Sequence, residues 1–262
     1  MTTITLLVKA AHGGQLRAID EALKTQFEEL DAQIEVLSNQ ANRWVQVEVS
    51  GEDEPIATSY IKKTYGTCPV TLENAKAEPT LKGYISKVDL SKQELRVDVG
   101  VFEPKAGQAI VSVACLQEQL AGGQKLPLQK IAEHYALADR VPLTVEVNWT
   151  NSAEEEFSSR LSVDQVEKLS SWRRSLLDRL LILGASKEHI EEVIERTRLG
   201  RDIVDVEVLG AFEYALTCKL GTDAAGLVPR MGRYMRNSVF VVFSAKKAWM
   251  GMDFSGEKGL TL

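Results

Sequence analysis

The spacing of hydrophobic and polar positions changes along the chain and divides it into four segments. In residues 1–78, apolar positions run together or alternate like strands, or recur at steps of three and four like helices. The predicted order is strand, helix, strand, strand, helix and a short last strand, over residues 4–9, 15–30, 34–37, 44–49, 53–65 and 69–72. This order indicates an α+β unit of the ferredoxin-like type. The polar stretch 73–79 is predicted to be a linker.

Residues 79–150 have a different sequence pattern, in which short apolar runs are separated by turn residues. The pattern predicts strands, with two short helices before the last of them, over residues 83–88, 95–101, 109–113, 116–120, 128–135 and 141–149. This order fits a small Greek-key β-barrel of the OB type. The hairpin that begins at Gly83 resembles the opening hairpin of RNA-binding barrel repeats in ribosomal and exosome proteins, although Tyr84 and Phe102 are its only aromatic residues.

Residues 151–200 have a helical pattern. Apolar residues from Leu161 to Leu183 predict one long helix with Ser162 as its N-cap. Gly184 ends this helix, and Ser186 is the predicted cap of a second one. The two make a predicted helical hairpin. A DNA-reading helix-turn-helix would show the same pattern, but the second helix carries four glutamates that would repel phosphate.

Strand patterns return in residues 201–262. Alternating valines predict a strand at 203–210, and further strands are predicted at 212–220 and 239–244. Glycines separate these strands, and together they indicate a small, basic, β-barrel-like module. The predicted fold class is therefore α+β: a ferredoxin-like-type unit, an OB-like β-barrel, a helical hairpin and a small β module, in that order.

The composition is that of an ordinary globular protein. The 262 residues are 44% hydrophobic and 26% charged, which excludes disordered, collagenous and disulfide-stapled chains. We find no stretch of ~20 apolar residues and no leader-like N-terminus, so neither a membrane span nor secretion is expected. The cysteines, Cys68, Cys115 and Cys218, form no Cys-x-x-Cys pair and suit a reducing cytoplasm.

The formal net charge of −6 is unevenly spread. Residues 1–156 hold 15 lysines and arginines against 23 aspartates and glutamates, whereas residues 157–262 hold 16 against 14. From Ala224 to Met252 there are five basic residues and no acidic one. Such an asymmetry is typical of a chain with an anionic partner such as a nucleic acid. The alternative is that the basic stretch meets the acidic half of its own chain or of a second copy.

The basic stretch supplies the candidate site. Arg230, Arg233 and Arg236 lie three residues apart and would share one face of a helix or turn, where guanidinium groups can bind phosphate. Lys246 and Lys247 would add phosphate contacts. The aromatic residues expected to stack on bases are Phe212, Tyr214 and Tyr234. The expected partner is RNA; the alternative is a solvated loop paired with acids elsewhere in the protein.

Residues with catalytic or metal-binding spacing are scarce. We find no metal-site spacing of histidines, no nucleophile elbow, no P-loop and no dinucleotide fingerprint. His12, which precedes two glycines, is interpreted as a polar loop residue, with a loop base as the alternative. Lys219, Thr222 and Asp223 are interpreted as turn residues, with a polar ligand site as the alternative. No catalytic residue, metal or cofactor is assigned, and a pocket around His12 or Asp223 would favour an enzyme.

Several short motifs along the chain are together typical of one protein family. They are Val97-Asp98-Val99-Gly100, Leu177-Asp178-Arg179-Leu180, Leu183-Gly184-Ala185, Arg201-Asp202-Ile203-Val204, Leu209-Gly210, Cys218-Lys219-Leu220-Gly221-Thr222-Asp223-Ala224, Gly226-Leu227-Val228-Pro229 and Gly232-Arg233-Tyr234. Together they resemble an archaeal family of proteins built from domains of unknown function, and the resemblance covers most of the chain. It implies an archaeal, cytoplasmic setting and transfers no activity.

The sequence thus predicts a non-enzymatic RNA-binding protein that serves translation or RNA processing. The alternative is a protein-interaction or assembly scaffold whose basic face meets an acidic partner. An enzyme is the least supported class, because the sequence shows no nucleophile with its base and no metal constellation. No membrane partner is expected.

Overall fold

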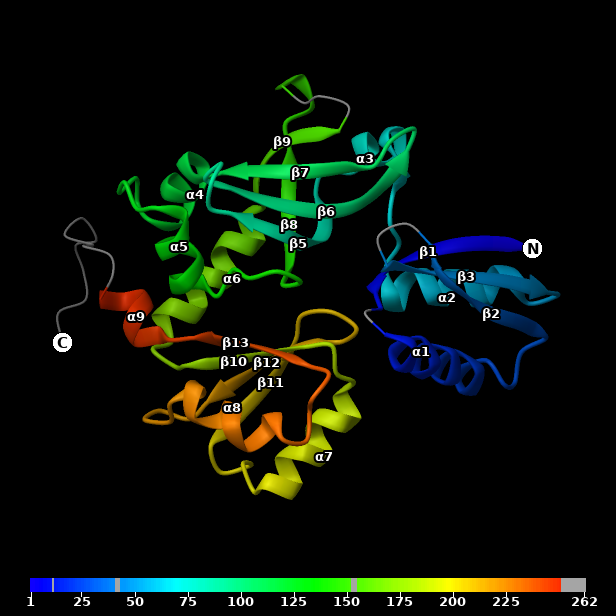
Figure 1. Ribbon diagram of the computed structural model, residues 1–262. Coiled ribbons are helices and arrows are strands. Elements are labelled where there is room, and N and C mark those ends of the chain that lie inside the picture. The colour runs from blue at the N-terminus through cyan, green and yellow to red at the C-terminus, as the bar shows by residue number, and fades with distance from the viewer. Residues whose placement is uncertain (11, 41–42, 152–154, 251–262) are drawn as a thin grey trace.

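The computed structural model describes residues 1–10, 12–40, 43–151 and 155–250 of the chain. Its described strands form three sheets, of three, six and four strands, with helices beside them (Figure 1). The fold class is therefore α+β, as predicted. In Figure 1 the three-stranded sheet lies at the right, the six-stranded sheet above and the four-stranded sheet below.

The N-terminal unit is an antiparallel sheet in the order β1-β3-β2, with two helices on one face. Its elements are β1 (Thr2–Lys9), α1 (Gly13–Gln26), β2 (Ala32–Gln40), β3 (Trp44–Gly51) and α2 (Glu54–Tyr65). Leu6 of β1 and Val47 of β3 are buried against Leu23 of α1 and Ile61 of α2. The predicted order of these elements is confirmed, because the spacing of apolar positions already places such residues on one face.

The next residues belong with the barrel rather than with the N-terminal sheet. β4 (Val70–Thr71) pairs in parallel with the barrel strand β6 (Glu94–Glu103). The predicted linker is wrong, since it holds the helix α3 (Leu72–Ala77), whose N-cap Thr71 accepts a hydrogen bond from the Asn74 amide. The sequence pattern does not show this helix because, within the polar stretch, only the small Ala75 is buried; Leu72, just before that stretch, also packs against the barrel core.

Five strands close a barrel between residues 81 and 161. They are β5 (Leu81–Asp89), β6, β7 (Gly107–Ser112), β8 (Pro142–Val147) and β9 (Glu156–Leu161). Their order is β6-β5-β8-β9-β7, and pairing of β6 with β7 closes the ring. Every neighbouring pair is antiparallel except β7 with β9. The helices α4 (Val113–Leu120) and α5 (Leu128–Tyr135) connect β7 to β8. This is the OB-like barrel that the sequence predicts.

The helical hairpin predicted over residues 151–200 is replaced by alternating strands and helices. β9 completes the barrel, and α6 (Val163–Arg174) packs on the barrel core. The chain then forms β10 (Arg179–Leu183), a central strand of the C-terminal sheet. All five residues of β10 are buried, and a short apolar run buried on both faces has the same sequence pattern as a buried helix. α7 (Lys187–Thr197) keeps its predicted place.

The C-terminal unit is a four-stranded antiparallel sheet in the order β11-β12-β10-β13. Its further elements are β11 (Ile203–Val208), β12 (Glu213–Cys218), α8 (Ala224–Gly232), β13 (Val239–Phe243) and α9 (Ala245–Met250). α7 and α8 cover one face, while Leu181 and Phe243 on the other face join the barrel core. The predicted strands are confirmed, but they form an open sheet rather than a barrel-like module, because β10 occupies its centre.

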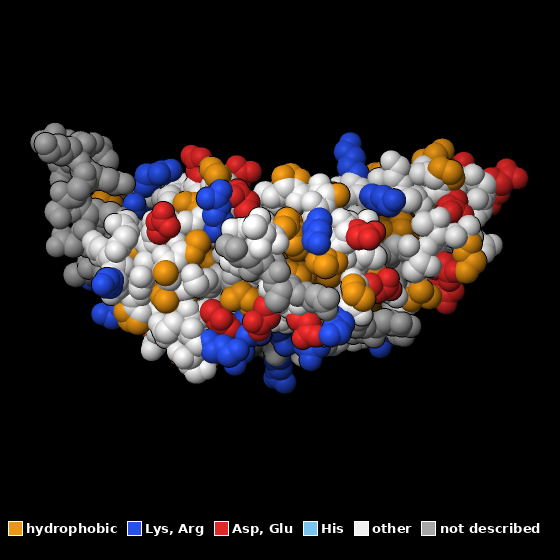
Figure 2. Space-filling model, turned by 90° about the horizontal axis from the view of Figure 1, so that it is seen from above, with side chains coloured by type: hydrophobic (Ala, Val, Ile, Leu, Met, Phe, Trp, Pro, Cys, Tyr) orange, Lys and Arg blue, Asp and Glu red, His pale blue; other side chains and the backbone are white. Residues whose placement is uncertain are grey.

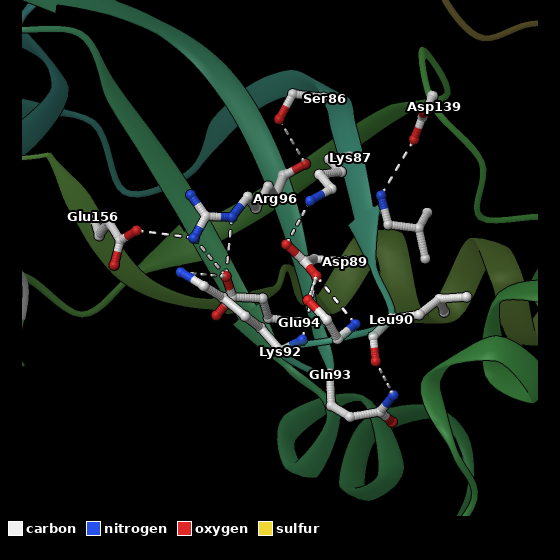
Figure 3. A network of polar contacts seen from close by, with 12 residues as sticks. Ser86, Lys87, Asp89, Leu90, Lys92, Gln93, Glu94, Arg96, Asp139 and Glu156 are labelled. Atoms are coloured by element: carbon white, nitrogen blue, oxygen red, sulfur yellow. Dashed lines mark hydrogen bonds and ion pairs between the residues drawn. The ribbon is translucent and has the colours of Figure 1, made fainter.

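The turn between β5 and β6 is fixed by its own side chains (Figure 3). The Asp89 carboxylate accepts hydrogen bonds from the amide and hydroxyl of Ser91 and from the Lys92 amide, and pairs with Lys87 at 2.7 Å. These donors, with Lys87 first among them, hold the pKa of Asp89 well below its ordinary range. The hairpin that opens the barrel is therefore preorganised by local charge.

Asp98 joins the N-terminal unit to the barrel. Its side chain on β6 is 4% exposed and pairs with the Lys9 ammonium at 2.5 Å. The same carboxylate accepts hydrogen bonds from the Trp44 indole at 3.2 Å and from the Gly100 amide at 3.1 Å. Lys9 Nζ also lies 4.7 Å from the centre of the Trp44 ring. One buried carboxylate thus links β1 and β3 to β6.

The turn before β12 joins the C-terminal unit to both other units. Phe212 is buried in the core of the N-terminal unit. The next residue, Glu213, accepts a hydrogen bond at 3.2 Å from the hydroxyl of Tyr84 on barrel strand β5. Glu213 is buried, and this burial raises its pKa to about 7. Two consecutive side chains therefore hold the three units together.

Replacing Asp98 by Asn should weaken the contact between the N-terminal unit and the barrel. The substitution leaves the largely buried Lys9 ammonium without its counter-charge, which costs about 3 kcal/mol of the free energy of unfolding. Urea unfolding followed by circular dichroism measures this loss. The matched control is Asp20→Asn, because Asp20 pairs with Lys24 on the surface of α1, where such pairs contribute ~0.3–0.5 kcal/mol. Equal losses in the two variants would contradict the assignment.

Glu213 should make stability depend on pH. Its pKa is about 7 in the folded protein against an ordinary value of 4.5, so between these values the folded chain keeps a proton that the unfolded chain has released. The free energy of unfolding therefore falls as pH rises through this window, by about 3 kcal/mol in total. Chemical unfolding at each end of the window tests this. In the Glu213→Gln variant, we expect most of the difference in free energy of unfolding between the two pH values to disappear. If the variant shows the same difference as the parent protein, the pH dependence comes from other groups.

Candidate nucleic-acid interface

The aromatic residues predicted to stack on bases are not exposed for stacking. Phe212 and Tyr214 are each 6% exposed, and the Tyr214 hydroxyl donates a hydrogen bond to the Ala211 carbonyl. The Tyr234 ring is covered by the Arg196 guanidinium, 4.7 Å from its centre. Alternation in the sequence suggested one exposed face, but β12 is buried along its whole length, with α7 and α8 on one face of its sheet and the barrel core on the other.

The three predicted arginines, Arg230 in the last turn of α8 and two that follow the helix, have different surroundings. Arg230 lies 3.4 Å from an Asp202 carboxylate oxygen and donates a hydrogen bond to the Thr197 carbonyl at 2.9 Å, so its charge is used within the protein. Arg233 and Arg236 are exposed, and neither pairs with a carboxylate in the part of the chain that the structure describes. Two of the three arginines are therefore open to an external anion.

The predicted lysines lie on α9, at the other end of β13 from Arg236. Lys246 and Lys247 are both exposed. α9 packs beside α5, where His134 is buried. Burial lowers the pKa of His134, and Lys130 and Lys247 lower it further while Glu133 opposes them. Lys130 thus belongs to the same basic surface, although nothing in the sequence connects it with α9.

The exposed cations form two groups rather than one continuous groove. Arg233 and Arg236 precede β13, and Lys246 and Lys247 follow it. At ~3.3 Å per residue, a five-residue strand separates the groups by about 17 Å. β13 is an edge strand of its sheet, so its outer edge lies between them. An extended polyanion could contact both groups along that edge.

Two arginines on the barrel strands are paired with carboxylates, although Lys82 on β5 is exposed. Arg96 lies between Glu94 and Glu156, at 2.6 Å and 2.9 Å (Figure 3), and Arg160 pairs with Glu146 at 2.7 Å. On the face of the molecule seen in Figure 2, Lys and Arg side chains over the middle of the molecule lie close to Asp and Glu side chains. A phosphate would have to displace these carboxylates, so the barrel face is not the favoured interface.

A pocket of about 290 Å³ lies between the N-terminal and C-terminal units, beside Arg236. The start of α1 lines it with His12 and Gly14, and the start of α7 lines it with Ser186 and His189. No Asp or Glu is among the described residues of this lining. The pocket therefore brings together a guanidinium, two imidazoles and two helix N-termini, a set that favours an anion.

The start of α1 is open at this pocket. The His12 side chain makes no capping hydrogen bond, and in the described ranges no group accepts a hydrogen bond from the Gly13 or Gly14 amide. The Nε2 atom of His12 is buried and has no hydrogen-bond partner there either. From the sequence, His12 is interpreted as a polar loop residue, with a loop base as the alternative. A pocket is the expected sign of that alternative, and the structure does place His12 at a pocket. Nothing in the pattern could connect His12 with Arg236, because the two belong to different units.

A larger cleft of about 1150 Å³ lies where the three units meet. Its lining includes Lys63 from the end of α2 and Lys82 from β5, together with the acids Glu78 and Asp164. The turn around Gly210, which carries the Phe212–Glu213 junction, forms one wall. Because charges of both signs line it, this cleft does not select an anion.

Lys219, Thr222 and Asp223, the other candidate residues, line a second pocket of about 210 Å³ together with Asp178. Asp223 is the N-cap of α8 and accepts a hydrogen bond from the Ala225 amide at 2.9 Å. Burial raises the pKa of the Cys218 thiol to about 11, so this cysteine is not poised as a nucleophile. Among the described residues, no three His, Cys, Asp or Glu side chains gather as metal ligands. None of the helices in the described ranges has the length and apolarity for crossing a membrane.

Three family models match the chain along most of its length. They are the DUF2110 N-terminal domain over residues 3–71, the DUF2110 central domain over residues 75–173 and the DUF2110 C-terminal domain over residues 177–243. These ranges correspond to the β1-β3-β2 unit, the barrel with α3 to α6, and the unit built around β10. No curated protein matches the chain.

Proposed function

The protein belongs to the DUF2110 family, and we propose that it is a non-enzymatic RNA-binding protein that serves translation or RNA processing. The observation that carries the proposal is the placement of four exposed cations at the two ends of β13: Arg233, Arg236, Lys246 and Lys247. Release of counterions from a neutralised phosphate chain supplies most of the affinity of such surfaces. The overall charge of −6 does not oppose this, because the acids lie mainly elsewhere in the chain.

Single-stranded RNA suits the spacing of the two cation groups. A span of about 17 Å along an edge strand corresponds to a few nucleotides of an extended strand, with phosphates at both ends of the span. The predicted stacking residues are buried, so we expect recognition to depend on phosphates more than on bases. The closed five-stranded barrel is a scaffold shared with many oligonucleotide-binding proteins, which supports the proposal only by analogy of fold.

A cytoplasmic location forms part of the proposal. Cys68, Cys115 and Cys218 are all free thiols, as expected in a reducing compartment. The archaeal setting is supported by the family resemblance of the sequence alone.

The salt dependence of RNA binding tests the interface. Each lost contact with a single-stranded phosphate lowers the slope of log affinity against log salt by ~0.7, so Arg233→Gln with Arg236→Gln should lower it by about 1.4. Lys246→Gln with Lys247→Gln should have a similar effect. Filter binding of a single-stranded oligonucleotide over a series of salt concentrations measures both slopes.

Arg230→Gln is the matched control for these variants. It removes the same charge from the same segment, but Asp202 and the Thr197 carbonyl already hold this guanidinium, so the slope should change little. Absence of RNA affinity at low salt would overturn the proposed function. Equal slopes for the control and both double variants would overturn the interface.

An acidic protein partner is the second candidate. On α9, Trp249 is 52% exposed close to Lys246 and Lys247, and aromatic residues are enriched at protein interfaces. Binding to an acidic protein would persist after nuclease treatment, whereas association through RNA would be lost. A surface that binds acidic proteins but no purified RNA would establish the scaffold function instead.

A further inference from the structure

We propose that the pocket between α1 and α7 binds a single phosphate group, such as inorganic phosphate or the terminal phosphate of a nucleic acid. The inference deepens the proposed function and, for RNA as the source of the phosphate, rests on it. The 290 Å³ volume is at the lower end of the ~300–1,000 Å³ typical of small-ligand sites, which suits one phosphate rather than a whole nucleotide.

The donors converge from three places in the chain. Arg236 comes from the loop before β13, His12 from the start of α1 and His189 from the first turn of α7. A guanidinium offers several N–H donors in a fixed plane and matches the geometry of phosphate oxygens. The described lining of the pocket contains no carboxylate, so a bound dianion meets no fixed negative charge within it.

His12 provides an observation that is independent of the helix ends. Its Nε2 atom has no hydrogen-bond partner in the described part of the protein, although it is buried. A buried polar atom without a partner costs about 1–3 kcal/mol, so a native structure that keeps one calls for a ligand or water there. A phosphate oxygen in the pocket would satisfy it.

The start of α1 is shaped for close approach of an anion. A Cβ at Gly13 would meet no atom within 4 Å, and one at Gly14 would meet only the His12 ring. Both amides lack an acceptor in the described ranges, and the helix behind them has 14 residues, enough to present a positive N-terminal dipole. At α7, in contrast, Ser186 already accepts the His189 amide, so α1 supplies the open amides.

Carboxylates outside the pocket limit what can enter. Glu192 lies 3.7 Å from His189 Nδ1, and Glu188 is in the first turn of α7. They make the rim on the α7 side negative. An anion would therefore enter the pocket past α1 and Arg236. This is the side on which the cations that precede β13 lie.

Isothermal titration of the full-length protein with inorganic phosphate tests the pocket. The expected result is saturable binding with one site, weakened about tenfold or more in Arg236→Gln, since a lost charge-assisted contact of 1.4 kcal/mol is a factor of ten. The control is Arg17→Gln, which removes an exposed cation of α1 that does not line the pocket and should leave the affinity unchanged. Circular dichroism confirms that each variant is folded.

A second variant covers the case in which Arg236→Gln disturbs its loop. His12→Gln keeps a polar side chain at the N-cap and should also weaken phosphate binding. Absence of saturable phosphate binding by the parent protein, or equal binding by the parent and both pocket variants, would overturn the inference.

Two oligonucleotides identify the source of the phosphate. An RNA with a 5′-phosphate should bind about tenfold more tightly than the same RNA with a 5′-hydroxyl, and Arg236→Gln should abolish the difference. If both RNAs bind equally and inorganic phosphate does not bind, the inference fails while the proposed function stands. If inorganic phosphate binds but neither RNA does, the proposed function fails, and the pocket is a site for a free phosphate compound.

Discussion

The arrangement of the whole molecule depends on the insertion of one turn, residues 209–213, into the place where the three units meet. Phe212 fills a space in the N-terminal core, and Glu213 meets Tyr84 of the barrel. This turn adds contacts among the three units to those made by Asp98 and by the face of the C-terminal sheet that packs on the barrel core, and so helps to fix α1 relative to α7. The candidate phosphate pocket is therefore a product of packing between units and not of any one of them.

Two buried carboxyl groups lie at the contacts between the units, and they differ in their charge state. Asp98 is paired with the Lys9 ammonium and accepts a hydrogen bond from the Trp44 indole, so its negative charge is compensated. Glu213 has hydrogen-bond donors but no paired cation among the described residues, and burial raises its pKa to about 7. The contact made by Asp98 is thus stabilised by an ion pair, while the contact made by Glu213 is most stable when its carboxyl group is neutral. The difference follows from the partners: Asp98 faces an ammonium group, whereas Glu213 faces a hydroxyl group. Burial of a carboxylate without a counter-charge favours its protonated form.

The charge distribution explains why the barrel and the C-terminal sheet present different surfaces. Around the barrel, Arg96 is neutralised by Glu94 of its own strand and by Glu156 of β9, and Arg160 by Glu146 of β8. At the ends of β13, the cations face solvent without such neighbours in the described residues. In a family with an OB-like barrel, the expected binding surface would be the barrel. Here the charges favour the edge of the C-terminal sheet instead, and the barrel serves mainly to connect the two terminal units.

The sequence by itself determined the local elements and the class of the fold. Periodicity placed most strands and helices, the N-caps Ser162 and Ser186, and the barrel, because each depends on residues close together in the chain. It could not distinguish β10 from a helix, since a strand buried on both faces has no alternation to read. The basic stretch was also visible in the sequence. Only the tertiary structure decided which cations remain unpaired and which aromatic residues are buried. It alone also placed His12 and Arg236 at the same pocket, because burial and pairing depend on neighbours from distant segments.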